Sequence, residues 1–302
     1  MKMEFESFVK EIMEMLQKRL GDGHLLVRRT ADGINGTKKN SLIVIDKRRD
    51  TDIYPCIRLD DHYREFASGA DMDWLLDKIA FACRKDDGMT DIDIAGFGKW
   101  DRIRDSIFGK LVNTEKNKRF LKGVPHREYL DLSIVYYARL NGGDEKNFGV
   151  IQIQKEHMGH WGVKEEDLYA KAMKNMEGDS EFDSIGNIIS RLAGEAAGAL
   201  MTESEEFPMF VLSNRYGVNG AAQICNAKAM KRVSGYFGGD FFILPSSIHE
   251  VILIPSRWCG QREKEFAEIV RDVNAGQLEP QEILSYHVYR YHGKTGEITI
   301  EA

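Results

Sequence analysis

The chain has 302 residues and a net charge of −6 at neutral pH, and 42% of its residues are hydrophobic. This length can bury a sizeable core in one large or two small domains without disulfide bonds. Because no apolar run approaches the roughly 18 residues of a membrane span, the opening helix carries acids, and the cysteines form no C-x-x-C pair, we expect a soluble, cytoplasmic protein with no membrane association.

The first part of the chain predicts helix, three-stranded meander and two helices. Apolar residues recur at helical spacing from residue 4, and Gly21 ends that helix. Pro55 favours an edge position for the third strand, and Asp71 can cap the last helix. The expected elements are helices over residues 4–20, 62–66 and from 72, and strands over 24–30, 41–46 and 53–59.

A hairpin is the clearest feature of the middle of the chain. Residues 141–144 read Asn-Gly-Gly-Asp between two β-rich runs, which is typical of a tight turn. The acidic run at 202–206 is the expected boundary between an N-terminal region, 1–203, and a C-terminal unit, 204–302. The expected elements are helices over residues 99–105, 115–121, 167–176 and 185–200, and strands over 107–112, 129–140 and 147–154.

The last third has the most consistent local signals. Asn226 can cap a helix that Gly238-Gly239 ends, and apolar runs precede and follow it. We therefore predict strand, helix, strand, tight turn and strand, then a helix over 261–273, a short helix from Pro280 and a terminal hairpin. The three strands are expected over 207–212, 241–244 and 251–254. They should bury six apolar residues in or beside one sheet: Phe210, Leu212, Phe242, Leu244, Ile252 and Ile254. Paired strands and segregated helices predict an α+β fold with antiparallel or mixed sheets.

Three stretches of this part carry a resemblance to a known family. They are YGVNGAA at 216–222, GGDFFILPSSIHEVILIP at 238–255 and VNAGQLEPQEILSYHVYRY at 273–291. The chain resembles a domain-of-unknown-function family, number 5688, of gut-dwelling Gram-positive anaerobes. The resemblance extends more loosely over the N-terminal half. It implies a bacterial origin and a shared fold, and it implies no activity.

Two short glycine motifs do not predict a cofactor. Gly293-Lys294-Thr295 looks like the end of a phosphate-binding loop, but Val288 replaces its first glycine and a strand follows where a helix is required. Gly96-Phe97-Gly98 begins a dinucleotide motif that Asp101 interrupts. We therefore expect no cofactor.

Histidines do not predict a metal site. His157 and His160 could ligate zinc or iron with Glu156 or Glu165, but no further histidine is near them in sequence. We interpret the two as solvated or helix-capping residues, and we expect no bound metal.

A hydrolase is the alternative that the turn after residue 245 suggests. Ser246, Ser247, His249 and Glu250 gather a nucleophile, a base and an acid in one turn. Catalytic groups usually converge from separate elements, and no G-x-S-x-G motif is present. We favour a structural turn and keep these four residues as the candidate catalytic group.

Charge is distributed unevenly along the chain. From residue 99 to 127 there are nine Lys or Arg against three Asp or Glu, whereas residues 161–206 hold four against eleven. Such asymmetry marks a docking face or two solvated faces, and the acidic balance elsewhere disfavours nucleic acid. The candidate binding residues are Asn219, Arg102, Arg104, Lys118 and Arg119.

These observations favour a cytoplasmic binding, regulatory or accessory protein with a protein partner. The alternative is a hydrolase or a nucleic-acid-processing enzyme whose groups are scattered in sequence. The sequence leaves enzyme activity and oligomeric state open.

Overall fold

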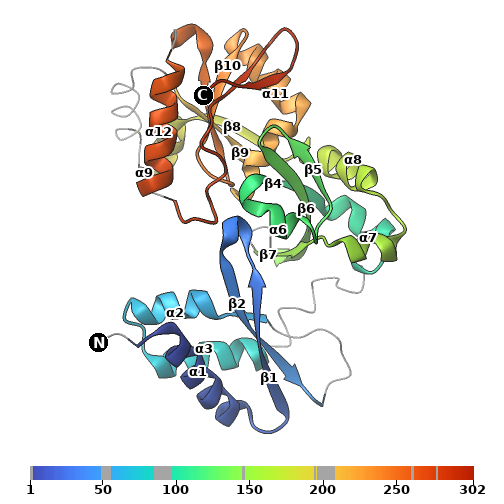
Figure 1. The fold of residues 1–302 in the computed structure, drawn as a ribbon, viewed down its shortest axis with the longest axis vertical. Coiled ribbons are helices and arrows are strands. Elements are labelled where there is room, and N and C mark those ends of the chain that lie inside the picture. Colours follow the sequence, from blue (N-terminus) through green and yellow to red (C-terminus); the bar gives the residue numbers. More distant parts are fainter. Residues whose placement is uncertain are drawn as a thin grey trace. The chain divides into compact units, whose positions relative to one another are not determined.

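The computed structural model describes residues 3–48, 56–84, 97–144, 147–193, 195, 208–259, 262–276 and 278–302 (Figure 1). The chain forms two compact units, Met1–Asp91 and Ile92–Ala302. This division differs from the one expected at 203/204, because strands on either side of residue 203 pair in one sheet. Pro55, Gly96 and the acidic run at 202–206 lie outside the described residues.

The described residues of the first unit form three helices that pack on one face of an antiparallel sheet. The strands are β1 (His24–Asp32), β2 (Lys38–Asp46) and β3 (Cys56–Arg58), in that order. A 3₁₀ turn, η1 (Ile34–Gly36), joins the first two, and Asn35 adopts a left-handed conformation there. The helices are α1 (Phe5–Leu20), α2 (Leu59–Ala67) and α3 (Met72–Arg84). The predicted order of helix, meander and two helices is therefore confirmed.

The core of the first unit follows from the spacing of its apolar residues. Phe8, Ile12 and Leu16 lie one turn apart along α1 and are fully buried. They pack against Leu42 and Val44, which share one face of β2 because alternate strand residues do.

The second unit begins with a four-stranded antiparallel sheet. Its long strand β6 (Leu132–Asp144) pairs with β4 (Ile107–Asn113), β5 (His126–Tyr129) and β7 (Asn147–Gln152). The predicted pairing of the two strands is present, but the predicted turn residues, 141–144, belong to β6, and the register of β6 and β7 shifts between Asn141 and Asp144. The helical elements are α5 (Trp100–Ile103), η2 (Arg104–Ser106), η3 (Glu115–Asn117), α6 (Lys118–Leu121), α7 (Lys155–Trp161) and α8 (Glu165–Met176).

A six-stranded antiparallel sheet forms the rest of the second unit, in the order β13-β12-β10-β11-β9-β8. Its strands are β8 (Ser180–Ser184), β9 (Phe210–Asn214), β10 (Phe241–Pro245), β11 (Val251–Pro255), β12 (Tyr289–Tyr291) and β13 (Ile298–Ile300). The helical elements are α9 (Ile185–Ala193), η4 (Gly220–Cys225), α11 (Ala227–Phe237), η5 (Ser256–Trp258) and α12 (Glu263–Gly276). The α+β class is confirmed, and every described strand pair is antiparallel.

Two helices supply cores for the six-stranded sheet. Phe241, Ile243 and Leu253 belong to the cluster that includes α11, whereas Phe242 and Ile254 pack with α12. The predicted strand, helix, strand, turn and strand are β9, α11, β10 and β11 with their connections. The cap is as predicted, since the Asn226 side chain accepts from the Ala229 N–H and Gly238 ends α11 in the left-handed conformation.

Several local expectations differ from the structure. Residues 280–282 form a turn where a short helix was expected. Phe210 and Ile252 are only half-buried, while the other four predicted core residues are buried. Strand β8 was not predicted.

Candidate functional site

The loop Asn214–Gly220 and the turn at 246–250 meet in the second unit. The Asn214 side chain donates to Val218 O at 2.8 Å and accepts from Tyr216 N at 3.0 Å. Gly217 and Asn219 both adopt left-handed conformations. A Cβ on Gly220 would lie 2.6 Å from His249 O and 2.7 Å from Asn214 N, so a larger residue does not fit. Close packing of the loop against the turn therefore explains why glycine occupies position 220.

The candidate catalytic turn is held together mainly by main-chain groups. Ser247 Oγ accepts from His249 N at 2.9 Å, and Ser247 N donates to Glu250 O at 3.2 Å. His249 Nδ1 accepts from Asn219 N at 3.2 Å, and its Nε2 lies 3.9 Å from Glu282 Oε1. No hydrogen bond between a serine hydroxyl and the His249 ring occurs among the described residues. Ser246 is half-buried in the same turn.

Burial alters both titratable groups of this turn. It lowers the pKa of His249, against the opposite effect of nearby Glu282. It raises the pKa of Glu250. With the Asn219 amide directed at Nδ1, the neutral imidazole carries its proton on Nε2, toward Glu282. The contacts connect Asn219 to His249 and link the two loops.

The basic candidates do not form one continuous stripe. Arg102 and Arg104 precede β4, and Lys118 and Arg119 follow it. The seven residues of β4 separate the pairs by roughly 20 Å at the usual rise of a strand. Arg104 lies 3.1 Å from Asp101, and Lys118 lies 2.7 Å from Glu115, so both have acids within their own turns.

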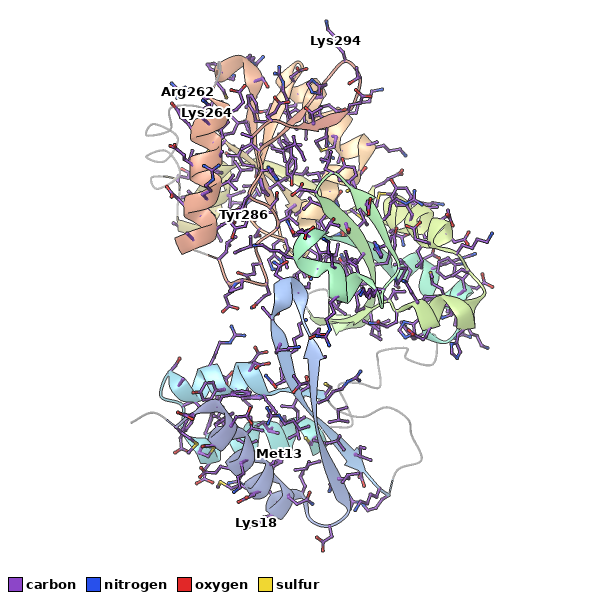
Figure 2. All side chains as sticks on the ribbon, in the orientation of Figure 1. Met13, Lys18, Arg262, Lys264, Tyr286 and Lys294 are labelled. Carbon is purple, nitrogen blue, oxygen red and sulfur yellow. The ribbon has the colours of Figure 1, made fainter. Side chains whose placement is uncertain are left out.

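The remaining sequence candidates occupy turns and helix ends. His157 Nδ1 accepts from Gln154 N at 3.1 Å, which confirms its helix-capping interpretation. Lys294 is exposed in the turn between β12 and β13, so a strand follows the Gly-Lys-Thr motif as predicted (Figure 2). Within the described ranges, no three His, Cys, Asp or Glu residues are grouped to hold a metal. No helix in those ranges is long and apolar enough to cross a membrane.

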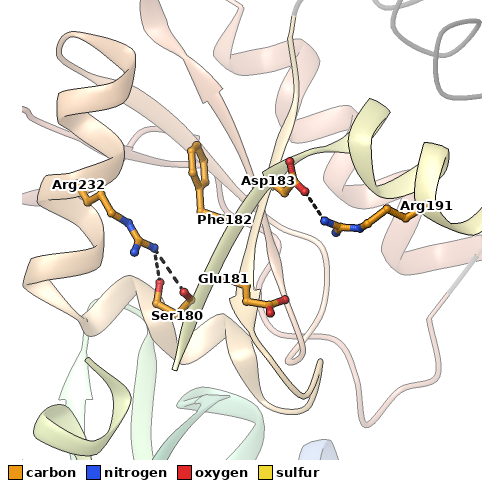
Figure 3. Close-up of a pocket in the computed structure, with 6 residues that line it drawn as sticks. All are labelled: Ser180, Glu181, Phe182, Asp183, Arg191 and Arg232. Carbon is orange, nitrogen blue, oxygen red and sulfur yellow. Dashed lines mark hydrogen bonds and ion pairs between the residues drawn. The ribbon is translucent and has the colours of Figure 1, made fainter. Parts of the chain in front are cut away.

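A groove of about 600 Å³ runs along β8, which lies at the edge of the six-stranded sheet (Figure 3). We call it the β8 groove. Arg232 Nη2, from α11, donates to Ser180 Oγ at 3.0 Å and Ser180 O at 3.4 Å. Arg191 Nη1, from α9, lies 2.7 Å from Asp183 Oδ2. The residues that line the β8 groove are Ser180, Glu181, Phe182, Asp183, Arg191 and Arg232.

The register of β8 shows which main-chain groups face the groove. Arg215 N donates to Asp179 O, and Ile185 N donates to Met209 O. Because hydrogen-bonded pairs alternate along antiparallel strands, Glu181 and Asp183 also bond to β9. The N–H and C=O of Phe182 therefore point away from β9. Neither group has a hydrogen-bond partner in the described part of the chain.

The groups on either side of Phe182 are already engaged. Ser180 O accepts from Arg232, and Ser184 N donates to Asp183 Oδ1 at 2.8 Å. Exposed main-chain groups at a sheet edge can pair with another chain, and such contacts reduce that tendency. The outward groups that flank Phe182, Ser180 O and Ser184 N, are thus engaged, whereas the N–H and C=O of Phe182 stay unpaired within the described residues.

An aromatic cluster of Phe182, Phe210 and Tyr236 lies beside this edge. The rings of Phe182 and Phe210 stack at 5.2 Å, and Tyr236 meets both edge-on at 5.5 and 5.6 Å. Tyr236 is 65% exposed, which is high for a large aromatic residue. The cluster offers apolar surface next to the unpaired main chain.

A sequence model of the Family of unknown function (DUF5688) matches residues 5–293 of this chain. The chain belongs to DUF5688. No curated protein and no solved structure matches it. The DUF5688 match covers both compact units, including β8 and the three stretches that carried the resemblance.

In this DUF5688 chain, a buried ion pair fixes the start of β8. Asp179 is 2% exposed at its side chain and lies 3.0 Å from Arg139 Nη2 and 2.7 Å from Arg215 Nε. The Arg139 guanidinium lies near the rings of Phe108 and Tyr216, at 3.9 and 4.1 Å. Strand β8 is therefore anchored at one end by groups from β6 and the loop after β9.

Sequence reasoning missed the groove because β8 gives a weak strand signal. Its five residues, Ser-Glu-Phe-Asp-Ser, contain one apolar side chain. One apolar residue among four polar ones shows no period-2 alternation, so the local pattern does not predict a strand. Arg191 and Arg232 are far from each other in sequence, so nothing local places them beside β8.

Proposed function

We propose that this DUF5688 protein is a protein-binding module that adds an extended segment of a partner to β8 as a further strand. The observation that carries the proposal is the outward N–H and C=O of Phe182, which open into the β8 groove. Strand addition to a free sheet edge is a common mode of peptide recognition, in which main-chain hydrogen bonds supply affinity.

The geometry favours an antiparallel ligand. In an antiparallel pair, one ligand residue exchanges both hydrogen bonds with Phe182, so the two unpaired groups are satisfied together. The aromatic cluster contacts the side chain of that residue. Every described pair in the sheet is antiparallel, and the added strand continues this arrangement.

A cytoplasmic regulatory or accessory role fits this mode of binding. The cysteines are free thiols, which supports the proposed cytoplasmic location because thiols stay reduced there. They are Cys56, Cys83, Cys225 and Cys259. Burial raises the pKa of Cys225, and that of Cys259 to about 11.

The test uses a random library of nine-residue peptides and two variants at one position. Phe182→Pro removes the outward N–H at an edge position, where proline is tolerated. Phe182→Ala removes the ring and keeps the N–H. We expect selected peptides to bind the wild type, to bind Phe182→Ala less tightly and to lose binding to Phe182→Pro, with both variants folded by circular dichroism.

Two measurements on a selected peptide complete the test. Its binding should slow hydrogen exchange at the Phe182 amide. N-methylation of the residue opposite Phe182 should abolish binding, whereas N-methylation of the next residue, whose N–H faces away, should not. A library without binders, or binders that are indifferent to Phe182→Pro, would refute strand addition at β8.

A further inference from the structure

The two faces of β8 present opposite charges that have no ionic partner within the described ranges. Arg232 lies on the face with α11, and its contacts are with the neutral Ser180 Oγ and O. Glu181 is exposed on the opposite face and forms no ion pair with any described residue. Figure 3 shows the two side chains on opposite sides of the strand.

The remaining charges of the groove compensate each other. Asp183 and Arg191 pair at 2.7 Å, and the Asp183 carboxylate also accepts from Asn187 Nδ2 at 2.7 Å. This end of the groove should therefore show no charge preference. The charge selectivity of the groove therefore depends on Arg232 and Glu181.

Because side chains alternate between the two faces of a strand, each β8 position predicts the type of ligand residue that lies opposite it. A residue on an added strand projects on the same face as the β8 residue directly opposite it. The residue opposite Phe182 meets the aromatic cluster, the residue opposite Glu181 meets a carboxylate, and the residue opposite Ser180 meets Arg232. An antiparallel ligand passes these positions in the order Phe182, Glu181, Ser180.

We infer that the ligand is an extended segment of a partner protein that carries an apolar, a basic and an acidic residue in succession, from its amino to its carboxyl end. This inference rests on the proposed strand addition at β8. The apolar residue supplies contact with Phe182 and Tyr236. The basic and acidic residues pair with Glu181 and Arg232.

The experiment compares two nine-residue peptides of equal composition, centred on Val-Lys-Glu and Val-Glu-Lys, in uniform Thr and Ser flanks. Dissociation constants are measured by fluorescence anisotropy at low ionic strength with the full chain. Because two cross-strand ion pairs are exchanged for two like-charge contacts, we expect Val-Lys-Glu to bind on the order of tenfold more tightly. Salt should reduce this ratio.

Variants assign the effect to the two side chains. Arg232→Gln should remove the preference for Glu over Gln at the third position and leave the preference for Lys at the second. Glu181→Gln should do the converse. In Arg232→Glu, a Val-Lys-Lys peptide should bind more tightly than Val-Lys-Glu, which a purely structural role of Arg232 does not predict.

The outcomes separate the inference from the function on which it rests. If both peptides bind equally and Phe182→Pro abolishes both, strand addition stands and the charge pattern is refuted. If neither peptide binds and the random library also yields no ligand, the proposed function fails as well. If Arg232→Glu leaves the order of the peptides unchanged, Arg232 does not read the acidic residue.

Discussion

Strands β10 and β8 each have five residues in the same sheet, yet they differ in almost every other respect. All residues of β10 are buried, and β10 pairs with β11 and β12. Strand β8 has no fully buried residue and pairs with β9 along one side only among the described strands. Strand β10 is specified by its buried side chains, whereas β8 leaves the main-chain groups of Phe182 unpaired within the described residues.

The difference shows where stability lies in this sheet and where the proposed binding edge lies. Central strands gain from apolar burial on both faces, so a change in side chain alters folding. An edge strand contributes less burial and keeps main-chain groups available for a further strand. Mutations in the central strand β10 should therefore change folding stability, whereas mutations in the edge strand β8 should have little effect on folding.

The largest expected effect is at the centre. Ile243→Asp places an unpaired carboxylate at a fully buried position of β10. Burying such a charge costs several kcal/mol, against a stability of roughly 5–15 kcal/mol, so the second unit should unfold. The same change at a half-exposed position of β8, Phe182→Asp, should leave the second unit folded. Thermal unfolding followed by circular dichroism makes the comparison, and similar losses from the two variants would refute it.

The next effect tests the anchor of β8. Asp179→Ala leaves Arg139 without its buried carboxylate partner, and breaking such a pair typically costs about 3–5 kcal/mol. Asp183→Ala removes an ion pair with the 65% exposed Arg191, for which about 1 kcal/mol is expected. Urea unfolding of the two variants measures the difference. A milder loss from Asp179→Ala than from Asp183→Ala would show that the buried pair does not hold the strand.

A smaller effect concerns Gly220, the first residue of η4. Gly220→Ala forces a methyl group against His249 O and Asn214 N, and overpacking of this kind costs about 1–3 kcal/mol. Gly235, within α11, has open space around its Cβ position. There the change to Ala should stabilise the helix by about 0.5–1 kcal/mol. Opposite signs in melting temperature are expected, and two losses of equal size would contradict the packing argument.

The same contrast explains what the sequence could predict. The strands β9, β10 and β11 were predicted because dense apolar runs between turn residues require burial, and the α11 caps were predicted from Asn226 and Gly238. The β8 groove was not predicted, because its key groups are a main-chain N–H and C=O and two arginines brought together by the fold. Sequence patterns report side-chain burial and do not report an unpaired main-chain edge.

The Gly220 region also shows why the sequence can group residues in one turn without giving their contacts to other loops. The sequence correctly grouped Ser247, His249 and Glu250 in one turn. It gave no sign that the His249 ring would accept from Asn219 N, 30 residues earlier in the chain. The left-handed conformation of Asn219 makes that contact available, and this conformation is a property of the folded loop.

The smallest expected effect is the pH dependence of stability that comes from His249. This residue lies between the central strands β10 and β11, whereas β8 contains no histidine. Burial lowers the pKa of His249 below its ordinary value of 6.5, so the unfolded chain binds its proton more readily. The free energy of unfolding should therefore fall as the pH drops below 6.5. Above that pH, His249 should contribute no pH dependence to it. Protonation also places a proton on Nδ1, where the Asn219 N–H now donates. Glu282 partly offsets the loss, and Lys110 adds to it.

The variant His249→Gln separates this contribution from the other histidines. A glutamine oxygen can still accept from Asn219 N, but it does not titrate in this range. Stability measured by urea unfolding at pH 7.5 and 5.5 should therefore decrease less in His249→Gln than in the wild type. His157→Gln is the control at a helix end, because burial also lowers the pKa of His157 and its Nδ1 accepts from Gln154 N. If His249→Gln has the same pH dependence as the wild type, the contact with Asn219 does not depend on a neutral imidazole.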